Sequence, residues 1–224
     1  MASIIKSEPD WPAPSNVRAF VTSRQGGYST DSFSSLNLAL HVNDRLASVK
    51  RNRAILQASV SRNLTFQWLN QIHSATVYRV DSAGPEKKGD GLLCKKPGIV
   101  CCILTADCLP VFFTNKLGTE IAIAHVGWRG MSEGIIQNVI NSMESCPRDV
   151  MAWLGPAIGP CHFEVGEEVK FIYSQSPLFE TIRYNVQRCF SCARDPEKYF
   201  LDLYQVAKVV LKSMGVNEVY GGDE

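Results

Sequence analysis

The chain has 224 residues, 45% hydrophobic and 20% charged, which is the composition of a globular protein able to bury a substantial core without disulfides or structural metal. Its net charge of +1 provides no electrostatic reason to expect nucleic acid or an anionic membrane as the main partner. The start, MASIIKSEPDWPAPS, has acids and prolines where a secretory signal has its apolar region, so we expect a cytoplasmic protein whose eight cysteines are reduced.

Short runs of β-branched, aromatic and leucine residues, bounded by Gly, Pro or Asp, predict strands, and amphipathic spacing predicts helices. After an N-terminal arm over residues 1–16, the predicted elements are strand Val17–Thr22, helix Arg45–Val60, strands Phe66–Asn70, Thr76–Val80, Gly91–Cys94, Ile99–Thr105, Pro110–Thr114 and Ile121–His125, helix Met131–Met143, strand Val150–Leu154, and helices Glu167–Ser174 and Asp202–Met214. The strands in the middle follow one another without a helix, which a regular βαβ protein would not allow. We therefore predict an α+β fold with mixed sheets.

Three of the predicted strands carry a possible metal ligand near one end. His73 lies in the connection within WLNQIHSATVYRV, Cys108 lies in the turn of ILTADCLPVFF, and His125 ends the strand of EIAIAHVGWRG. A set of two histidines and a cysteine is typical of zinc sites with three protein ligands and one open position, where bound water becomes acidic. Because their wide separation in sequence matches no compact zinc-finger pattern, a site formed by these three residues is one hypothesis among several.

The alternatives assign each residue a simpler role. A free cysteine at a strand end is commonly a buried small hydrophobe, and a lone histidine in a turn is commonly a solvated or hydrogen-bonded residue. Asp107 can cap a turn through its own backbone. His162, beside Cys161, has a context that does not distinguish it from a surface histidine.

Two glycine-rich turns are compatible with a functional pocket. GWRG lies between a predicted strand and a helix, where backbone amides and Arg129 can face an anion. LGPAIGPCHFEVG contains two Gly-Pro pairs and can form one stiff wall of a cleft. Both can equally be connections whose φ angles require glycine.

The order of several motifs resembles the YfiH family, whose members are described as multicopper polyphenol oxidoreductase (laccase-domain) proteins or as purine nucleoside phosphorylases. The motifs are TSRQGGYS, SLNLALHVND followed by VKRNRAIL, NQIHSATV, GDGLL, TADCLPV, AHVGWRG, GPAIGPCHFEVG and LDLYQVAKVVL. They run from about Thr22 to Asp223. The resemblance implies one catalytic domain over residues 17–224, with mixed β-sheets sandwiched between helices in an α/β/β/α-like arrangement.

The resemblance also implies roles for particular residues. Family members hold a metal with the histidine of Q-x-H, the cysteine of A-D-C and the histidine of H-x-G-W-R-G, which correspond here to His73, Cys108 and His125. Arg24 of TSRQGG and Arg129 of GWRG match positions suited to the phosphate or ribose of a substrate. Cys108 and His125, with Asp107 as a proton shuttle or orienting group, are the expected catalytic residues.

The chain departs from the family pattern in two places. LALHVND has Ala39 and Asn43 where the family motif has glycines. Family members continue beyond the G-G-D motif for roughly twenty residues with aromatic and arginine residues, whereas this sequence ends at YGGDE. We therefore expect the domain to lack that C-terminal tail.

The first functional hypothesis is a zinc-dependent purine nucleoside enzyme. Zinc lowers the pKa of bound water from ~15.7 towards ~7, which suits deamination of adenosine. Phosphorolysis of adenosine or inosine uses phosphate as the nucleophile, and Arg24 and Arg129 suit its binding. The expected partners are a purine nucleoside and phosphate, with no nucleic acid and no membrane, and we expect a monomer.

Three other hypotheses remain open. A copper-dependent polyphenol oxidase is the second, since Cu²⁺ competes well for nitrogen and sulfur ligands, although four histidines cannot build both an electron-entry site and a three-copper cluster. A cysteine hydrolase with Cys108 activated by His125 is the third, and would suit the editing of peptidoglycan precursors to which family members are linked. A non-enzymatic ligand sensor is the fourth.

Overall fold

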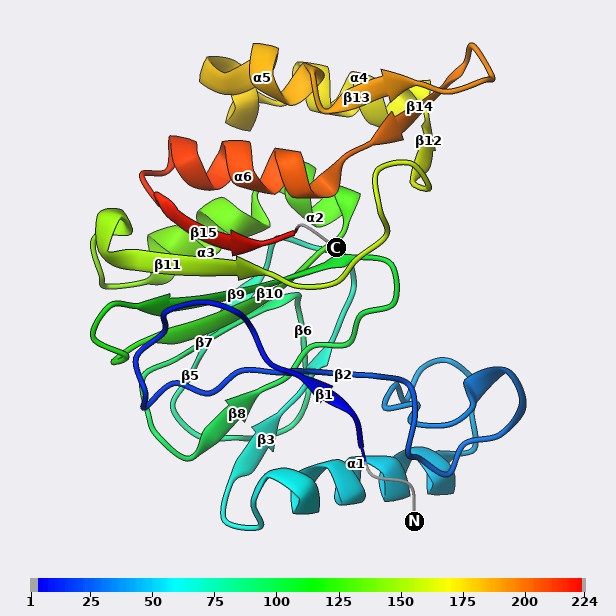
Figure 1. Ribbon diagram of the computed structural model, residues 1–224, viewed down its shortest axis with the longest axis vertical. Coiled ribbons are helices and arrows are strands. Elements are labelled where there is room, and N and C mark those ends of the chain that lie inside the picture. Colours follow the sequence, from blue (N-terminus) through cyan, green and yellow to red (C-terminus); the bar gives the residue numbers. More distant parts are fainter. Residues whose placement is uncertain (1–3, 223–224) are drawn as a thin grey trace.

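A six-stranded mixed sheet forms the centre of the protein, whose computed structural model describes residues 4–222 (Figure 1). Its order is β15-β11-β9-β10-β7-β5. The strands are β5 (Val77–Val80), β7 (Gly91–Cys94), β9 (Leu109–Asn115), β10 (Ile121–Val126), β11 (Val150–Leu154) and β15 (Glu218–Gly221). The inner pairs are antiparallel, whereas β5 with β7 and β11 with β15 are parallel.

Helices cover one face of this sheet and enclose the larger hydrophobic core (Figure 1). They are α2 (Trp128–Glu133), α3 (Ile135–Ser142) and α6 (Leu203–Ser213). Beyond them lie α4 (Glu167–Gln175), α5 (Arg183–Gln187), the 3-10 helix Pro177–Ile182 and a small sheet of β12 (Glu164–Gly166), β14 (Lys198–Leu201) and β13 (Phe190–Cys192). The Asp202 side chain caps α6 by accepting the amide N–H of Gln205.

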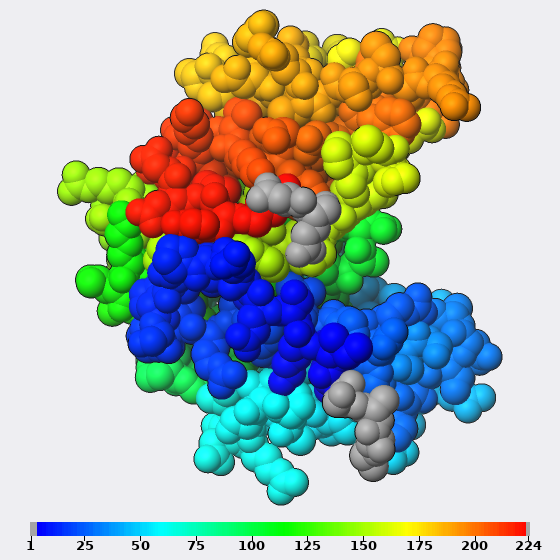
Figure 2. Space-filling model, in the orientation of Figure 1, coloured from blue at the N-terminus to red at the C-terminus, as the bar shows by residue number. Residues whose placement is uncertain are grey.

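Shorter elements and a smaller hydrophobic cluster lie on the opposite face of the sheet. They are β1 (Lys6–Ser7) with β2 (Val21–Thr22), β3 (Thr65–Gln67) with β8 (Ile99–Cys101), β4 (Leu69–Asn70) with β6 (Lys87–Lys88), the helix α1 (Leu46–Val60) and the 3-10 helix Asp31–Phe33. A further 3-10 helix, Pro147–Asp149, lies directly before β11. Figure 2 shows the N-terminal segment, in blue, packed across this side between β15 and the region of β3 and α1.

Strand alternation assigns the residues of β10 to the two faces. Ala122, Ala124 and Val126 belong to the larger core, and Ile123 belongs to the smaller cluster. Successive side chains on a strand point to opposite faces, so His125 lies on the same side as Ile123. The helix-covered face thus provides rigid packing, and the other face presents His125.

The α+β class and the mixed sheets predicted from the sequence are confirmed. The predicted helix Met131–Met143 is instead part of two helices, because Gly134 with φ +91° ends α2 and precedes α3. The predicted strand Ile99–Thr105 ends at Cys101, beyond which Leu104 bonds to a glutamine side chain instead of a ladder partner.

The N-terminal predictions hold in part. Only Val21–Thr22 of the predicted strand Val17–Thr22 is a strand, and it pairs with Lys6–Ser7, within the predicted arm. Residues 1–3 of that arm and Asp223 of the G-G-D motif lie outside the described residues. Among residues 4–222, the helices are too short or too polar for any of them to cross a bilayer.

We predict that Leu93→Ala lowers the free energy of unfolding by about 2–5 kcal/mol, because Leu93 is fully buried in the central sheet and its loss leaves a cavity. Leu117→Ala is the matched control, since Leu117 is 76% exposed, and it should change stability by no more than about 0.5 kcal/mol. Urea unfolding measures both, and equal losses would contradict this assignment of the core.

Candidate metal centre

The three predicted ligands come together in space. One ligand atom from each of His73, Cys108 and His125 lies within 4.8 Å of the others. The two imidazole rings meet edge to face, with centroids 4.9 Å apart. His125 is buried, Cys108 half-buried and His73 exposed, so the cluster is open on one side. All three border a cleft of about 1430 Å³ between the central sheet and the N-terminal segment.

A fully buried carboxylate, Asp90, holds two of these ligand segments together. It accepts Nδ1–H of His125 at 2.9 Å and the backbone N–H groups of Ile72, His73 and Ser74 at 3.3, 3.0 and 2.7 Å. The Ser74 hydroxyl donates a further bond at 2.8 Å. The backbone oxygen of Asp90 also accepts the N–H of His125. Such a set of converging amides is an anion-binding nest filled by a protein carboxylate.

Asp90 is not among the site residues predicted from the sequence, although it lies in the motif GDGLL. An acidic residue between two glycines, directly before the apolar strand Gly91–Cys94, is a signal for a buried carboxylate that must find donors. Its partners lie elsewhere in the chain, so their identity came only from the fold.

Gln71 ties the His73 segment to the Cys108 segment. Its side-chain amide donates to the backbone oxygen of Leu104 at 2.8 Å and accepts the Leu104 N–H at 2.7 Å. His73 itself has φ +59°, a left-handed conformation that is uncommon outside glycine, asparagine and aspartate. The nest around Asp90 and the Gln71 contact hold this turn in place.

Gly127, the residue before α2, leaves room for the ligands. A Cβ at this position would lie 2.9 Å from the Sγ of Cys108 and 3.2 Å from the Cδ2 of His73. Its φ of −80° and ψ of 170° are open to any residue. Glycine is therefore needed here for space, since a side chain would displace the thiol.

The charges of the cluster follow from burial and hydrogen bonding. Burial by itself lowers the pKa of His125, but hydrogen bonds to Asp90 and Cys108 outweigh it and raise that pKa to about 9. Burial raises the pKa of Asp90, yet the bonds from His125 and Ser74 hold it below its usual value. Burial and then the nearby His125 lower the pKa of His73.

This arrangement suits a metal ion. An ionised Asp90 can only accept hydrogen bonds, so Nδ1 of His125 carries a proton and Nε2 points away from Asp90. A metal ion at Nε2 would displace the second proton that the raised pKa of His125 keeps on the ring. A carboxylate behind a histidine ligand is the usual second partner in metal sites. Two imidazoles and one thiol, open on one side, form the donor set of an ion with one exchangeable position.

Two of the other predicted site residues border the cleft. Asp107 is exposed and borders the cleft, and its backbone oxygen accepts the N–H of Ile158. Arg24 also borders the cleft, and its guanidinium donates to the backbone oxygens of Ser34 and Ser32.

Arg129 lies in α2, with its guanidinium 4.2 Å from the centre of the Trp128 ring, and its charge acts on the pKa of His73. His162 is an exposed residue and is not part of the ligand group. His41 borders the cleft together with His73 and His125.

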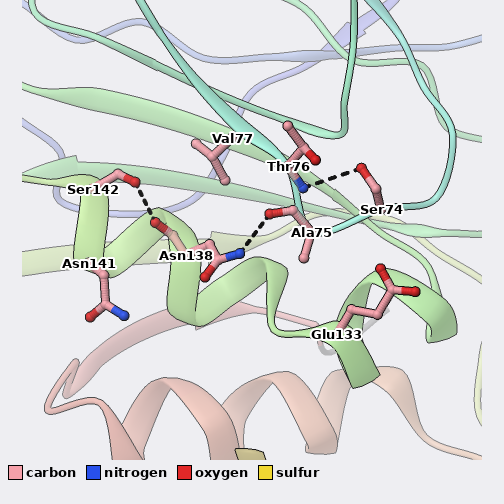
Figure 3. Close-up of a pocket in the computed structure, with 8 residues that line it drawn as sticks. All are labelled: Ser74, Ala75, Thr76, Val77, Glu133, Asn138, Asn141 and Ser142. Carbon is pink, nitrogen blue, oxygen red and sulfur yellow. Dashed lines mark hydrogen bonds between the residues drawn. The ribbon is translucent and has the colours of Figure 1, made fainter.

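A second, shallower hollow lies on the helical side of the Ser74 segment (Figure 3). It is lined by Ser74, Ala75, Thr76, Val77, Glu133, Asn138, Asn141 and Ser142. Asn138 of α3 donates to the backbone oxygen of Ala75 at 2.8 Å, and the Ser74 hydroxyl accepts the Thr76 N–H. These bonds fix the start of β5 against α3 and so support the segment that surrounds Asp90.

Comparisons with known proteins agree on one family. The family described as "Multi-copper polyphenol oxidoreductase laccase" matches residues 18–224. A purine nucleoside phosphorylase of Pseudomonas aeruginosa is 39% identical over 96% of this chain and 85% of its own length. The purine nucleoside phosphorylase YfiH of Escherichia coli is 38% identical over 96% of this chain and 86% of its own length.

Solved structures share the fold. A Neisseria meningitidis protein superposes with a TM-score of 0.89 and 40% identity, covering 98% of this chain and 87% of that one. The YlmD protein of Geobacillus stearothermophilus superposes with a TM-score of 0.82 and 28% identity, covering 94% and 82%.

We predict that Asp90→Asn weakens zinc binding about 10–100-fold, because an amide cannot accept all of the bonds that fix His125 and the His73 turn. Competition with a chromophoric chelator measures the affinity, with circular dichroism as the check on folding. Asp81→Asn, at an exposed position, is the control. Unchanged affinity in Asp90→Asn would contradict the positioning role.

We predict that Gly127→Ala weakens zinc binding about tenfold while unfolding stability changes by less than about 1 kcal/mol, since the backbone tolerates alanine but Cys108 must move. Gly159→Ala is the control, because a Cβ there meets no atom within 4 Å. Metal titration and urea unfolding of both variants provide the comparison, and equal affinities would show that the close approach at Gly127 has no effect on the ligands.

Proposed function

We propose that this chain, which belongs to the multi-copper polyphenol oxidoreductase laccase family, is a purine nucleoside phosphorylase whose reaction takes place at the His73–Cys108–His125 cluster. The names of the relatives and the geometry of the cluster both support this proposal. Relatives that are 39% and 38% identical carry the name purine nucleoside phosphorylase. The convergence of the three ligand atoms is the structural observation that carries the proposal.

The proposed metal is zinc, held by His73, Cys108 and His125. Zinc accepts this mixture of thiolate and imidazole in tetrahedral sites, and Cu²⁺ can bind the same donors. When bound, the ion supplies Lewis acidity to a group at its open position. Asp90 keeps the His125 ring oriented, and Gly127 keeps the thiol within reach.

The remaining roles concern the substrate. Phosphorolysis brings a phosphate anion to the ribose carbon that bears the base, and we assign its binding to Arg24 and Arg129. Arg24 borders the cleft, and Arg129 is close enough to influence His73 electrostatically. We assign to Asp107, which is exposed at the cleft beside Cys108, the exchange of a proton with the departing purine.

Adenosine deamination belongs to the same proposal. It requires a nucleophilic water at the purine ring and leaves the phosphate site unused. The proposed partners remain a purine nucleoside and phosphate. The eight free cysteines support a reducing compartment, and the cytoplasm stays our prediction.

A polyphenol oxidase is the alternative that the family description suggests. Reduction of dioxygen to water takes four electrons and several coppers. Among residues 4–222, His73, Cys108 and His125 form the one group of three or more metal-binding side chains. Phenol oxidation by a copper-loaded sample is therefore a secondary property of this site in our proposal.

A cysteine hydrolase is the alternative that the geometry suggests. His125 is hydrogen-bonded to Asp90 on one side and to Cys108 on the other, which is the order of a carboxylate–imidazole–thiol triad. The metal hypothesis needs the same contacts. The two differ in whether activity survives removal of the ion.

We predict that the purified protein releases hypoxanthine from inosine only when phosphate is present, and that Cys108→Ala lowers kcat/KM by at least about 1000-fold while the protein stays folded. Cys161→Ala is the control, because Cys161 is an exposed cysteine away from the cluster. Base release is followed by absorbance, and metal content is measured in the same samples.

Each other outcome selects a different function. Ammonia release without phosphate identifies a deaminase. Phenol oxidation that tracks copper content identifies an oxidase. Activity that persists in metal-free protein but is lost on alkylation of Cys108 identifies a cysteine hydrolase and refutes the metal-dependent proposal.

A further inference from the structure

Asn52 of α1 is a fully buried polar residue outside the metal cluster. It is 0% exposed, and its side-chain amide is fully hydrogen-bonded. Oδ1 accepts the backbone N–H of Tyr28 at 2.7 Å. Nδ2 donates to the Ser29 hydroxyl at 3.0 Å and to the backbone oxygens of Ser35 and Asn37 at 3.1 and 2.8 Å. This one amide therefore joins both ends of a loop.

The loop held by Asn52 comprises residues 28–37, and we call it the 28–37 loop. Within these residues, all of which the structure describes, the one regular element is the 3-10 helix Asp31–Phe33. A loop with so little regular structure depends on side-chain hydrogen bonds to fix its backbone, and a buried amide whose groups are all paired fixes it firmly. Asn52 thus sets the course of the loop against α1.

We propose that Asn52 is a positioning residue for phosphate: by fixing the 28–37 loop, it orients the guanidinium of Arg24 at the cleft. This role rests on the proposed function, in which Arg24 binds phosphate. Asn52 is fully buried and so cannot touch a ligand itself, which means that it acts through Arg24.

The loop holds Arg24 by its side chain and by its backbone. Nε of Arg24 donates to the backbone oxygen of Ser34 at 2.8 Å, and Nη2 donates to that of Ser32 at 3.2 Å. The backbone oxygen of Arg24 accepts the N–H groups of Ser35 and Leu36 at 2.9 and 2.7 Å. All four partners come from the part of the loop that lies between its attachments to the buried amide.

The held guanidinium keeps donors for a ligand. An arginine has five N–H donors, and the loop carbonyls take two of those of Arg24, which leaves three for an anion in the cleft that it borders. A guanidinium that is already oriented loses less freedom when it binds phosphate. If the loop samples other shapes, the apparent affinity falls in proportion to the competent fraction.

Ser29 connects Asn52 to a second anchor of the loop, the carboxylate of Asp44. The Ser29 hydroxyl accepts from Asn52 and donates to Asp44 at 2.6 Å, and the Asn37 side chain donates to the same carboxylate at 2.9 Å. These bonds lower the pKa of Asp44 and keep it charged. Ser29→Ala therefore loosens the same loop more gently than Asn52→Ala does, because the other bonds of Asn52 remain.

The first test is the affinity of the folded protein for inorganic phosphate, measured by phosphorus NMR titration. We expect Asn52→Ala to weaken binding about tenfold and Ser29→Ala about threefold. Gln57→Ala is the matched control, because Gln57 lies on the same helix and donates to the backbone oxygen of Leu64, away from the loop. It should bind phosphate like the unmodified protein. Circular dichroism checks the folding of each variant.

The second test asks whether the effect of Asn52 passes through Arg24. Arg24→Lys keeps a positive charge but loses the planar fork that the loop carbonyls hold. In this background, we expect Asn52→Ala to change phosphate affinity by less than about twofold. During turnover, Asn52→Ala should raise the KM for phosphate about tenfold while the KM for inosine changes by less than about twofold, a split that general loosening of the fold would not produce.

The outcomes separate this role from the proposed activity. Phosphate binding that depends on Asn52, without any release of base from inosine, would refute the phosphorylase and support the positioning role. Three results would overturn the positioning role: no phosphate binding by the unmodified protein, equal affinity in Asn52→Ala, or an equal loss with lysine at position 24. If Asn52→Ala does not fold, Ser29→Ala decides in its place, and unchanged affinity there would overturn the role.

Discussion

The burial of one carboxylate governs the architecture of the site. Asp90 is fully buried and ionised, so the fold must supply hydrogen-bond donors to offset its lost hydration. It obtains them from three consecutive amides of the His73 turn, from the Ser74 hydroxyl and from the ring of His125. The hydrogen bonds that stabilise the charge of Asp90 therefore also position the ligands His73 and His125. A turn with His73 in a left-handed conformation persists because this nest determines it.

The two faces of the central sheet contribute differently to this arrangement of Asp90 and the ligands. The helix-covered face of the central sheet is packed with fully buried apolar residues such as Leu93, Val111 and Val139, which hold β7, β9 and β10 in register. The other face is less completely filled and contains the cleft. A rigid layer behind an open layer allows His125 to be both fixed by β10 and accessible to a ligand.

The same contacts serve more than one chemistry. A hydrogen-bonded chain runs from Asp90 through His125 to Cys108. This chain can orient the ligands of a metal site, and it is also the order of groups in a thiol hydrolase. What favours the metal is the third ligand, because a hydrolytic triad would not need the imidazole of His73 beside that of His125. The glycine at position 127 fits the same interpretation, since it lets the thiol and the His73 ring crowd together.

The amino-acid sequence by itself determined the local features whose cause lies within a few residues. The run of short strands in the middle of the sequence predicted an α+β protein with His125 at a strand end, and residue chemistry with family motifs singled out His73 and Cys108. The sequence did not predict the short strands β1, β6, β12, β13, β14 and β15, because their few residues depend on a partner strand for hydrogen bonds.

Only the tertiary structure decided which groups meet. Asp90 acts on residues 16 to 35 positions away and Gln71 on Leu104, 33 positions away, and neither has a local pattern that predicts those partners. The requirement for space at Gly127 likewise comes from Cys108 and His73, which reach it from other segments. Contacts between distant segments depend on the strand register that burial imposes, and that register belongs to the whole sheet.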